Sequence, residues 1–108
     1  MPTREEIRQS LLDKANSLPL TPGVYIMKDR EGRVIYVGKS RKLKNRVSQY
    51  FQNSEKNIKT ARMVAAVRDF EYFLCDTEIE ALTLENTLIK QHNPKYNIRL
   101  KEIGRAHV

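Results

Sequence analysis

Residues 23–38 place the strongest constraint on the fold, because two strand-like runs flank a short polar turn. The runs GVYIMK (23–28) and RVIYVG (33–38) are rich in Val, Ile and Tyr, and the segment DREG (29–32) separates them. Turn-forming residues between two such runs are typical of an antiparallel β-hairpin. The chain is therefore expected to contain a hairpin to which the other elements add.

The hairpin brings two tyrosines close together. If the turn closes symmetrically, with Asp29 opposite Gly32, then Tyr25 lies directly opposite Tyr36 on one face of the sheet. A bulge in the turn would offset the two residues by one position. The direct pairing is thus a conditional prediction.

The remaining elements follow from helix caps and from the spacing of apolar residues. Thr3 with Glu6, and Thr77 with Glu80, have the spacing of capping boxes. Residues 70–75 (FEYFLC) are predicted to form a third strand, which is apolar enough to lie centrally in the sheet. The predicted helices are 4–18, 42–52, 57–67 and 78–92, and the third strand is 70–75. This order predicts a small α+β domain with a largely antiparallel central sheet of about three strands, flanked by helices.

Size and composition narrow the class of protein. The chain has 108 residues, of which 40% are hydrophobic and 31% charged, as in a single folded domain with a modest core. It lacks the apolar run of about 18 residues that a membrane helix needs, and its N-terminus does not resemble a signal peptide. The lone Cys75 excludes an internal disulfide and is expected to be buried as a small apolar group. We expect a cytoplasmic protein without a membrane partner.

The chain is basic, and its cations are clustered. The net charge is +7, from 20 Lys and Arg against 13 Asp and Glu. Five cations follow the hairpin within eight residues and without a carboxylate between them: Lys39, Arg41, Lys42, Lys44 and Arg46. Such a run favours a polyanionic partner such as nucleic acid, although a solvated face without a partner is the alternative.

The last predicted helix contains a carboxylate on its apolar face. At about 100° per residue, Ala81, Leu82, Leu88 and Ile89 all lie within about 60° of Glu85. Burying an unpaired carboxylate is costly, so Glu85 is expected to meet a metal, a hydrogen-bond donor or a cation. Two interpretations remain open: a functional metal ligand, or a structural ion pair with an arginine such as Arg46 or Arg62.

Tyrosines, cations and a lone acid can together cleave a phosphodiester. Mg²⁺ is often held by one or two carboxylates plus water, and Arg and Lys offset charge on phosphate. A tyrosine can take a proton from water if nearby cations lower its pKa from about 10. Lys39, three residues after Tyr36, is the candidate source of that field.

The same residues resemble a known family. Gly23-Val24-Tyr25 and Tyr36-Val37-Gly38 are similar to the two signature tripeptides of the GIY-YIG nucleases, with Val in place of Ile in both. The segments PGVYIMKDREGRVIYVGKSRKLKNRVSQYF and EALTLENTLIKQHNPKYN resemble the N-terminal domains of UvrC-type proteins. The likeness covers roughly residues 10–100, which predicts a GIY-YIG nuclease domain over residues 1–100. Residues 101–108 (KEIGRAHV) do not continue as the family does, and we expect a foreign tail without function.

The resemblance implies a role for each matching position. Tyr36 matches the general base, Tyr25 its companion in the site, and Glu85 the single ligand of a Mg²⁺ or Mn²⁺ ion. Arg46 matches the arginine that stabilises the scissile phosphate. The resemblance further implies catalytic roles for Lys39, Tyr50 and Asn97, and Arg41, Lys42 and Lys44 are expected to be DNA contacts.

The resemblance also implies an activity and partners. UvrC-type domains make the 3′-side incision in nucleotide excision repair, by water attack on DNA, and act with UvrB through regions expected outside this chain. We expect the isolated domain to be monomeric. The alternatives are a non-catalytic nucleic-acid-binding module that stacks bases on its tyrosines, and a GIY-YIG nuclease of another lineage.

Overall fold

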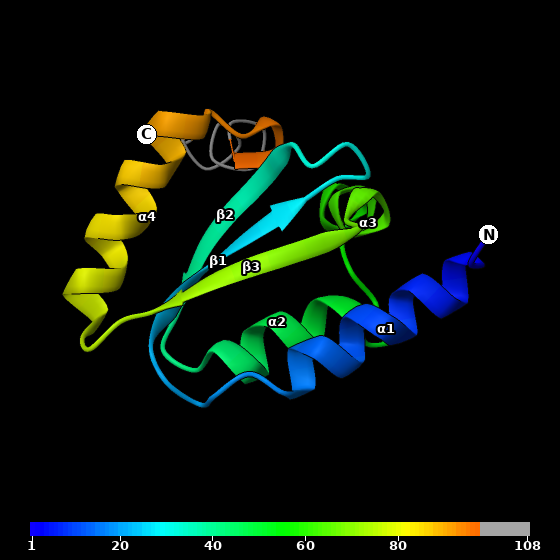
Figure 1. Cartoon of the computed structure of the whole chain (residues 1–108), viewed down its shortest axis with the longest axis horizontal. Coiled ribbons are helices and arrows are strands. Elements are labelled where there is room, and N and C mark those ends of the chain that lie inside the picture. Colours follow the sequence, from blue (N-terminus) through cyan, green and yellow to red (C-terminus); the bar gives the residue numbers. More distant parts are fainter. Residues whose placement is uncertain (98–108) are drawn as a thin grey trace.

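The computed structural model describes residues 1–97, and its three-stranded antiparallel sheet has helices on both faces (Figure 1). The elements are α1 (Arg4–Asn16), β1 (Gly23–Lys28), β2 (Val34–Ser40), α2 (Leu43–Phe51), α3 (Ile58–Ala66), β3 (Asp69–Leu74) and α4 (Glu78–His92). Every predicted element is present within two residues of its expected bounds, so the α+β class is confirmed. The predicted tail, residues 101–108, lies outside the described residues.

The order of the strands in the sheet is β2-β1-β3, so the prediction of a central strand at residues 70–75 is wrong. The central strand is β1, in which Gly23 to Met27 are all buried. A strand that is covered on both faces has a continuous apolar run, and GVYIM has that pattern. In β3 only Phe70 is buried, and the apolar residues that follow it lie at an exposed edge.

The pairing of β1 with β2 differs by two residues from the pairing expected for a symmetric turn. The backbone N–H of Asp29 donates to the carbonyl of Arg33 at 3.0 Å, which leaves a three-residue loop with Gly32 at a φ of 80°. A second shift lies between Met27 and Lys28, where the ladder is irregular. The predicted direct pairing of the two tyrosines is therefore wrong.

Two shifts of one residue nevertheless keep the tyrosines on one face, because side chains alternate with a period of two. Tyr25 lies opposite Gly38, and Tyr36 lies opposite Met27. The ring centroids of Tyr25 and Tyr36 are 6.2 Å apart. The prediction of a shared face is confirmed.

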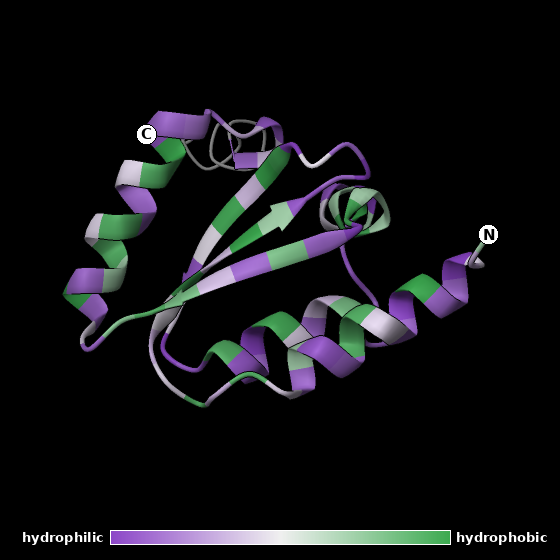
Figure 2. Ribbon diagram, viewed as in Figure 1, coloured by the Kyte–Doolittle hydropathy of each residue, from purple (hydrophilic) through white to green (hydrophobic). Residues whose placement is uncertain are grey.

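The two faces of the sheet carry two separate cores. Tyr25 and Met27 of β1 point to the face that α1, α2 and α3 cover, while Val24 and Ile26 point to the face that α4 covers. Figure 2 shows apolar and polar residues interleaved along α4, as expected for a helix with one face on a sheet. Cys75 is buried in the α4 core, as predicted. Among residues 1–97, no helix combines the length and apolar character needed to cross a membrane.

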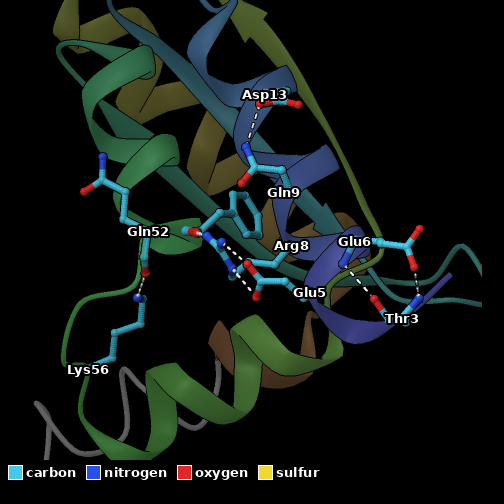
Figure 3. A network of polar contacts seen from close by, with 9 residues as sticks. Thr3, Glu5, Glu6, Arg8, Gln9, Asp13, Gln52 and Lys56 are labelled. Atoms are coloured by element: carbon cyan, nitrogen blue, oxygen red, sulfur yellow. Dashed lines mark hydrogen bonds and ion pairs between the residues drawn. The ribbon is translucent and has the colours of Figure 1, made fainter.

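Helix caps place α1 and α4 as predicted. The Thr3 hydroxyl accepts from the Glu6 N–H, and the Glu6 carboxylate accepts from the Thr3 N–H, which completes a capping box (Figure 3). At α4 the structure shows the Thr77 half of the second box, in which the hydroxyl accepts from the Glu80 N–H at 3.1 Å.

Asn97 fastens the outer edge of the sheet. Its side-chain oxygen accepts from the Val37 N–H, and its amide nitrogen donates to the Val37 carbonyl, both at 2.7 Å. Asn97 is only 1% exposed. The amide thus makes the pair of hydrogen bonds that a neighbouring strand would make with β2. It holds the segment after α4 against the strand that carries Tyr36.

Asn97→Ala is predicted to destabilise the domain by about 2–4 kcal/mol, because it leaves the buried N–H and carbonyl of Val37 unpaired. Urea unfolding followed by circular dichroism measures this loss. Asn97→Asp replaces the donor with a buried carboxylate oxygen that faces the Val37 carbonyl, so at neutral pH it should be at least as destabilised as Asn97→Ala. Equal stability of Asn97→Ala and wild type would contradict a structural role for the two bonds.

Candidate active site

Three tyrosines from three elements meet beside the sheet. Tyr25 comes from β1, Tyr36 from β2 and Tyr50 from the last turn of α2. The hydroxyl groups of Tyr25 and Tyr50 are hydrogen-bonded at 2.8 Å, and their ring centroids are 5.7 Å apart. Tyr25 is 1% exposed, whereas the other two rings are half-buried. Tyr25 is therefore the anchor, and the outer tyrosines keep access to solvent.

Arg46 lies beside this cluster. Its guanidinium carbon is 6.0 Å from the Tyr50 ring centroid, and interaction with the Tyr25 hydroxyl raises the pKa of Arg46. The residue is one helical turn before Tyr50 on α2, so both side chains point the same way. The arginine is exposed rather than sheltered, which leaves its charge open to an anion.

Glu85 is buried on α4, as its position on the apolar face predicts. It is 8% exposed, and Ala81 and Leu88 of the same face are also buried. Leu82, predicted on that face, is instead 44% exposed, because it lies on the border of the buried stripe. Helix α4 packs against the edge strand β2, so Glu85 comes within electrostatic range of Tyr36.

The pKa of Tyr36 is shifted opposite to the expectation. Burial, then the neighbouring Tyr50 and Glu85, raises the pKa of Tyr36 to about 12, and Arg46 offsets only part of this rise. Burial and the other two tyrosines also raise the pKa of Tyr25 well above its usual value. The protein alone therefore holds Tyr36 protonated at neutral pH.

Lys39 does not supply the field expected of it. Its partner in the ladder is Val24, which belongs to the core under α4, so Lys39 belongs to the opposite face of the sheet from Tyr36. Lys39 is exposed, and it is not among the main causes of the pKa shift of Tyr36. The geometry thus supports an anion contact at Lys39 rather than an influence on the tyrosine.

The three predicted DNA contacts lie where β2 leads into α2. Arg41 and Lys42 are exposed, and Lys44 is half-buried. The Arg41 Nε is 2.5 Å from a carboxylate oxygen of Glu78, at the start of α4. The basic run contains no acid in the sequence, but in the structure Glu78 forms an ion pair with Arg41. The charge of Arg41 is therefore partly neutralised.

Two glycines of the hairpin permit close packing that the sequence analysis missed, and Gly38 does so within the tyrosine cluster. A Cβ on Gly38 would lie 2.3 Å from the ring and hydroxyl of Tyr25, and a Cβ on Gly23 would lie 2.4 Å from the Phe73 carbonyl. The signal was their place in the two signature tripeptides. Each glycine admits a neighbouring group that a side chain would exclude.

The donor set suits a hard divalent cation. Residues 1–97 contain no cluster of three or more His, Cys, Asp or Glu side chains, so a metal here would rest on few protein ligands. Glu85 offers a carboxylate within electrostatic range of Tyr36, and Mg²⁺ accepts one or two carboxylates while retaining water. The residues present therefore fit Mg²⁺ or Mn²⁺ held chiefly by Glu85.

Comparison with known proteins identifies relatives of this arrangement. The family model described as the UvrC-like GIY-YIG domain matches residues 21–98. UvrABC system protein C of Caldicellulosiruptor saccharolyticus is 57% identical over 93 residues, which are 86% of this chain and 16% of that protein. The same protein of Methanosarcina barkeri is 55% identical over 89 residues, 82% of this chain and 17% of the relative. The chain thus spans about a sixth of the length of these relatives.

Solved structures agree with the sequence relatives. The chain is similar to the GIY-YIG N-terminal endonuclease domain of UvrC from Thermotoga maritima bound to its catalytic divalent cation, magnesium. The TM-score is 0.72 at 35% identity, with 82% of this chain and 96% of that chain covered. A point mutant of that domain, with one tyrosine changed to phenylalanine and also bound to the cation, has a TM-score of 0.73 over 82% of this chain and 94% of that one.

Gly38→Ala is predicted to displace the Tyr25 ring and weaken its hydrogen bond to Tyr50, because the new methyl group overlaps the ring. We expect a loss of about 1–3 kcal/mol in unfolding free energy and a changed tyrosine signal in near-ultraviolet circular dichroism. Gly32→Ala is the control, since its Cβ meets no neighbour and only its φ of 80° is unfavourable. That variant should lose about 1–2 kcal/mol without the spectral change. An unchanged spectrum in Gly38→Ala would contradict the predicted displacement.

Tyr36 is predicted to titrate near its shifted pKa of about 12. Because the unfolded chain titrates near pH 10, the folded state holds more protons between these values, and stability falls as pH rises through that window. Tyrosinate absorbance followed against pH measures the shift, and Tyr36→Phe should remove one late-titrating tyrosine. If the titration of Tyr36→Phe instead lacks a tyrosine that ionises near pH 10 in the wild type, the pKa of Tyr36 is not raised.

Proposed function

Because this chain belongs to the family of UvrC-like GIY-YIG domains, we propose that it is a DNA endonuclease domain that depends on a divalent metal ion. The observation that carries the proposal is the burial of Glu85 within electrostatic range of Tyr36, beside Tyr50 and Arg46. A buried carboxylate close to a phenol can serve as one of the few protein ligands that Mg²⁺ needs, because the ion retains much of its water. We propose that the functional unit is residues 1–100.

We further propose the place of this domain in a longer protein. As part of a UvrC, it makes the incision on the 3′ side of a damaged nucleotide during nucleotide excision repair in the cytoplasm. UvrB is the proposed partner, through regions outside this chain. The names of the relatives, UvrABC system protein C, support this assignment. The isolated domain is proposed to be a monomer.

The proposed reaction is hydrolysis of one DNA strand. Water attacks the phosphorus, the bond to the 3′ oxygen breaks, and the products carry a 3′-hydroxyl and a 5′-phosphate. When bound at Glu85, Mg²⁺ or Mn²⁺ supplies positive charge that polarises water and offsets charge on the phosphate. Arg46, exposed beside Tyr50, neutralises a phosphate oxygen, and Lys39 contacts the backbone of the DNA.

Tyr36 is the proposed acceptor of the proton from water, directly or through a second water. Burial, Tyr50 and Glu85 keep Tyr36 protonated in the protein alone, and a cation held by Glu85 would offset the contribution of that carboxylate to the raised pKa. Tyr25 positions the outer groups through its hydrogen bond to Tyr50 and its contact with Arg46. Asn97 holds the strand that carries Tyr36 by its two bonds to Val37.

A non-catalytic nucleic-acid-binding module is the rival function. The exposed cations Lys39 and Lys42 and the half-buried tyrosines favour nucleic-acid binding in either case. The two functions differ in their need for a metal. A nuclease of another lineage is set aside, because the family model and the relatives are of the UvrC type.

Glu85→Gln is predicted to lower the nicking of supercoiled plasmid DNA by at least about a hundredfold, since Gln retains the shape and loses the charge. Nicking is measured by gel electrophoresis with Mg²⁺ or Mn²⁺, and the melting temperature confirms that the variant folds. Glu80→Gln, an exposed acid of the same helix, is the matched control and should nick at the wild-type rate. Wild-type nicking by Glu85→Gln would disprove the metal role.

Removal of the metal separates the nuclease from the rival module. With EDTA, we expect nicking to stop while affinity for DNA is largely retained. A chain that binds DNA but never nicks it, with or without Mg²⁺ or Mn²⁺, would favour the rival.

A further inference from the structure

An apolar groove lies on the side of the tyrosine cluster away from Glu85's helix. The groove is bounded by α1, by the loop that follows α2, and by α3. Its volume is about 450 Å³. Ile7, Leu11 and Val64 supply apolar walls. This volume is in the range of sites that hold small organic groups, and it is large enough for a group of the size of a nucleobase.

The rim of the groove is basic. Four cations line it, against the single acid Glu55: Arg4, Arg8, Lys56 and Arg68. Lys56 donates to the carbonyls of Gln52 and Ser54, and Arg68 donates to the carbonyls of Ala65 and Val67. These neutral acceptors orient the cations without cancelling their charge.

Arg8 is the exception at the rim, since its guanidinium pairs with Glu5 and donates to the Phe51 carbonyl at 2.6 Å. Figure 3 shows Arg8 held against Glu5 while Lys56 reaches back to Gln52 from the facing loop. Arg8 thus ties α1 to the end of α2 and shapes the groove, and the uncancelled charge comes from the other three cations.

The groove and the candidate active site share one side chain, that of Tyr50. Tyr50 lines the groove, and its hydroxyl is bonded to that of Tyr25. The Arg46 guanidinium carbon is 6.0 Å from the centroid of the same Tyr50 ring, so a phosphate bound at Arg46 lies near the groove.

We propose that the groove binds one unstacked nucleotide of the DNA strand that enters the site. The base occupies the apolar floor, and the flanking phosphates contact Lys56, Arg68 and Arg4. This inference rests on the proposed function and adds a subsite to it. An acidic peptide matches the charge of the rim equally well, but the continuity with the tyrosines and Arg46 favours DNA.

The test measures binding without catalysis. A short fluorescein-labelled single-stranded oligonucleotide, and the same oligonucleotide with one base removed at successive positions, are titrated with the chain in EDTA by fluorescence anisotropy. Loss of the base at one position should weaken binding by at least about fivefold, because stacking of one base on an aromatic side chain such as Tyr50 contributes about 1–3 kcal/mol. Equal affinities for all oligonucleotides would overturn the proposal.

Two variants locate the effect. Ala61→Trp fills the groove from its exposed edge, and Lys56→Glu reverses one rim charge. Both should bind the intact oligonucleotide at least about fivefold more weakly, and Ala61→Trp should bind intact and base-free forms equally. Ile58→Trp and Lys59→Glu make the same changes at exposed positions outside the groove and should lose at most about twofold.

Two results would overturn the proposed subsite. Variants that bind like their matched controls would overturn the subsite. A Glu-rich peptide that binds wild type and not Ala61→Trp, with DNA binding unchanged, would assign the groove to a protein partner and also overturn it. Failure of the nuclease appears separately, as absent plasmid nicking, and leaves this metal-free measurement intact.

Discussion

The contact between the Tyr25 ring and Gly38 is the interaction on which the site depends. The ring occupies the space that a side chain at position 38 would take, directly across the ladder. In that position its hydroxyl reaches Tyr50, and Arg46 lies close by. Because Tyr25 is almost fully buried, this geometry is set by the core rather than by solvent-exposed side chains. The two half-buried tyrosines are arranged around a fixed centre.

The electrostatics of the site explain why the domain is suited to a cation. Burial and the proximity of Glu85 and Tyr50 keep Tyr36 neutral in the protein alone. A positive ion near Glu85 would offset the charge of that carboxylate and so favour the ionised tyrosine. The pKa of Tyr36 thus depends on the charge of Glu85, and Arg46 partly counters the rise.

The elements of the fold were predictable from local signals. Thr3 and Thr77 mark the starts of α1 and α4, and the DREG turn marks the hairpin. Strand order was not predictable, since the apolar residues of 70–75 resemble a central strand but lie at an edge. Hydrophobicity reports how apolar a segment is, whereas its position in the sheet depends on which neighbours the whole chain supplies.

The sequence by itself determined the residue types of the site: two tyrosines on one face of a hairpin, a basic helix, and an acid on an apolar stripe. Tertiary structure decided which of them meet. Two single-residue shifts in the hairpin place Gly38 rather than Tyr36 across from Tyr25, strand alternation separates Lys39 from Tyr36, and the packing of α4 on β2 brings Glu85 to it. The physical reason is that register and helix packing follow from the fit of the whole core, which no local pattern encodes.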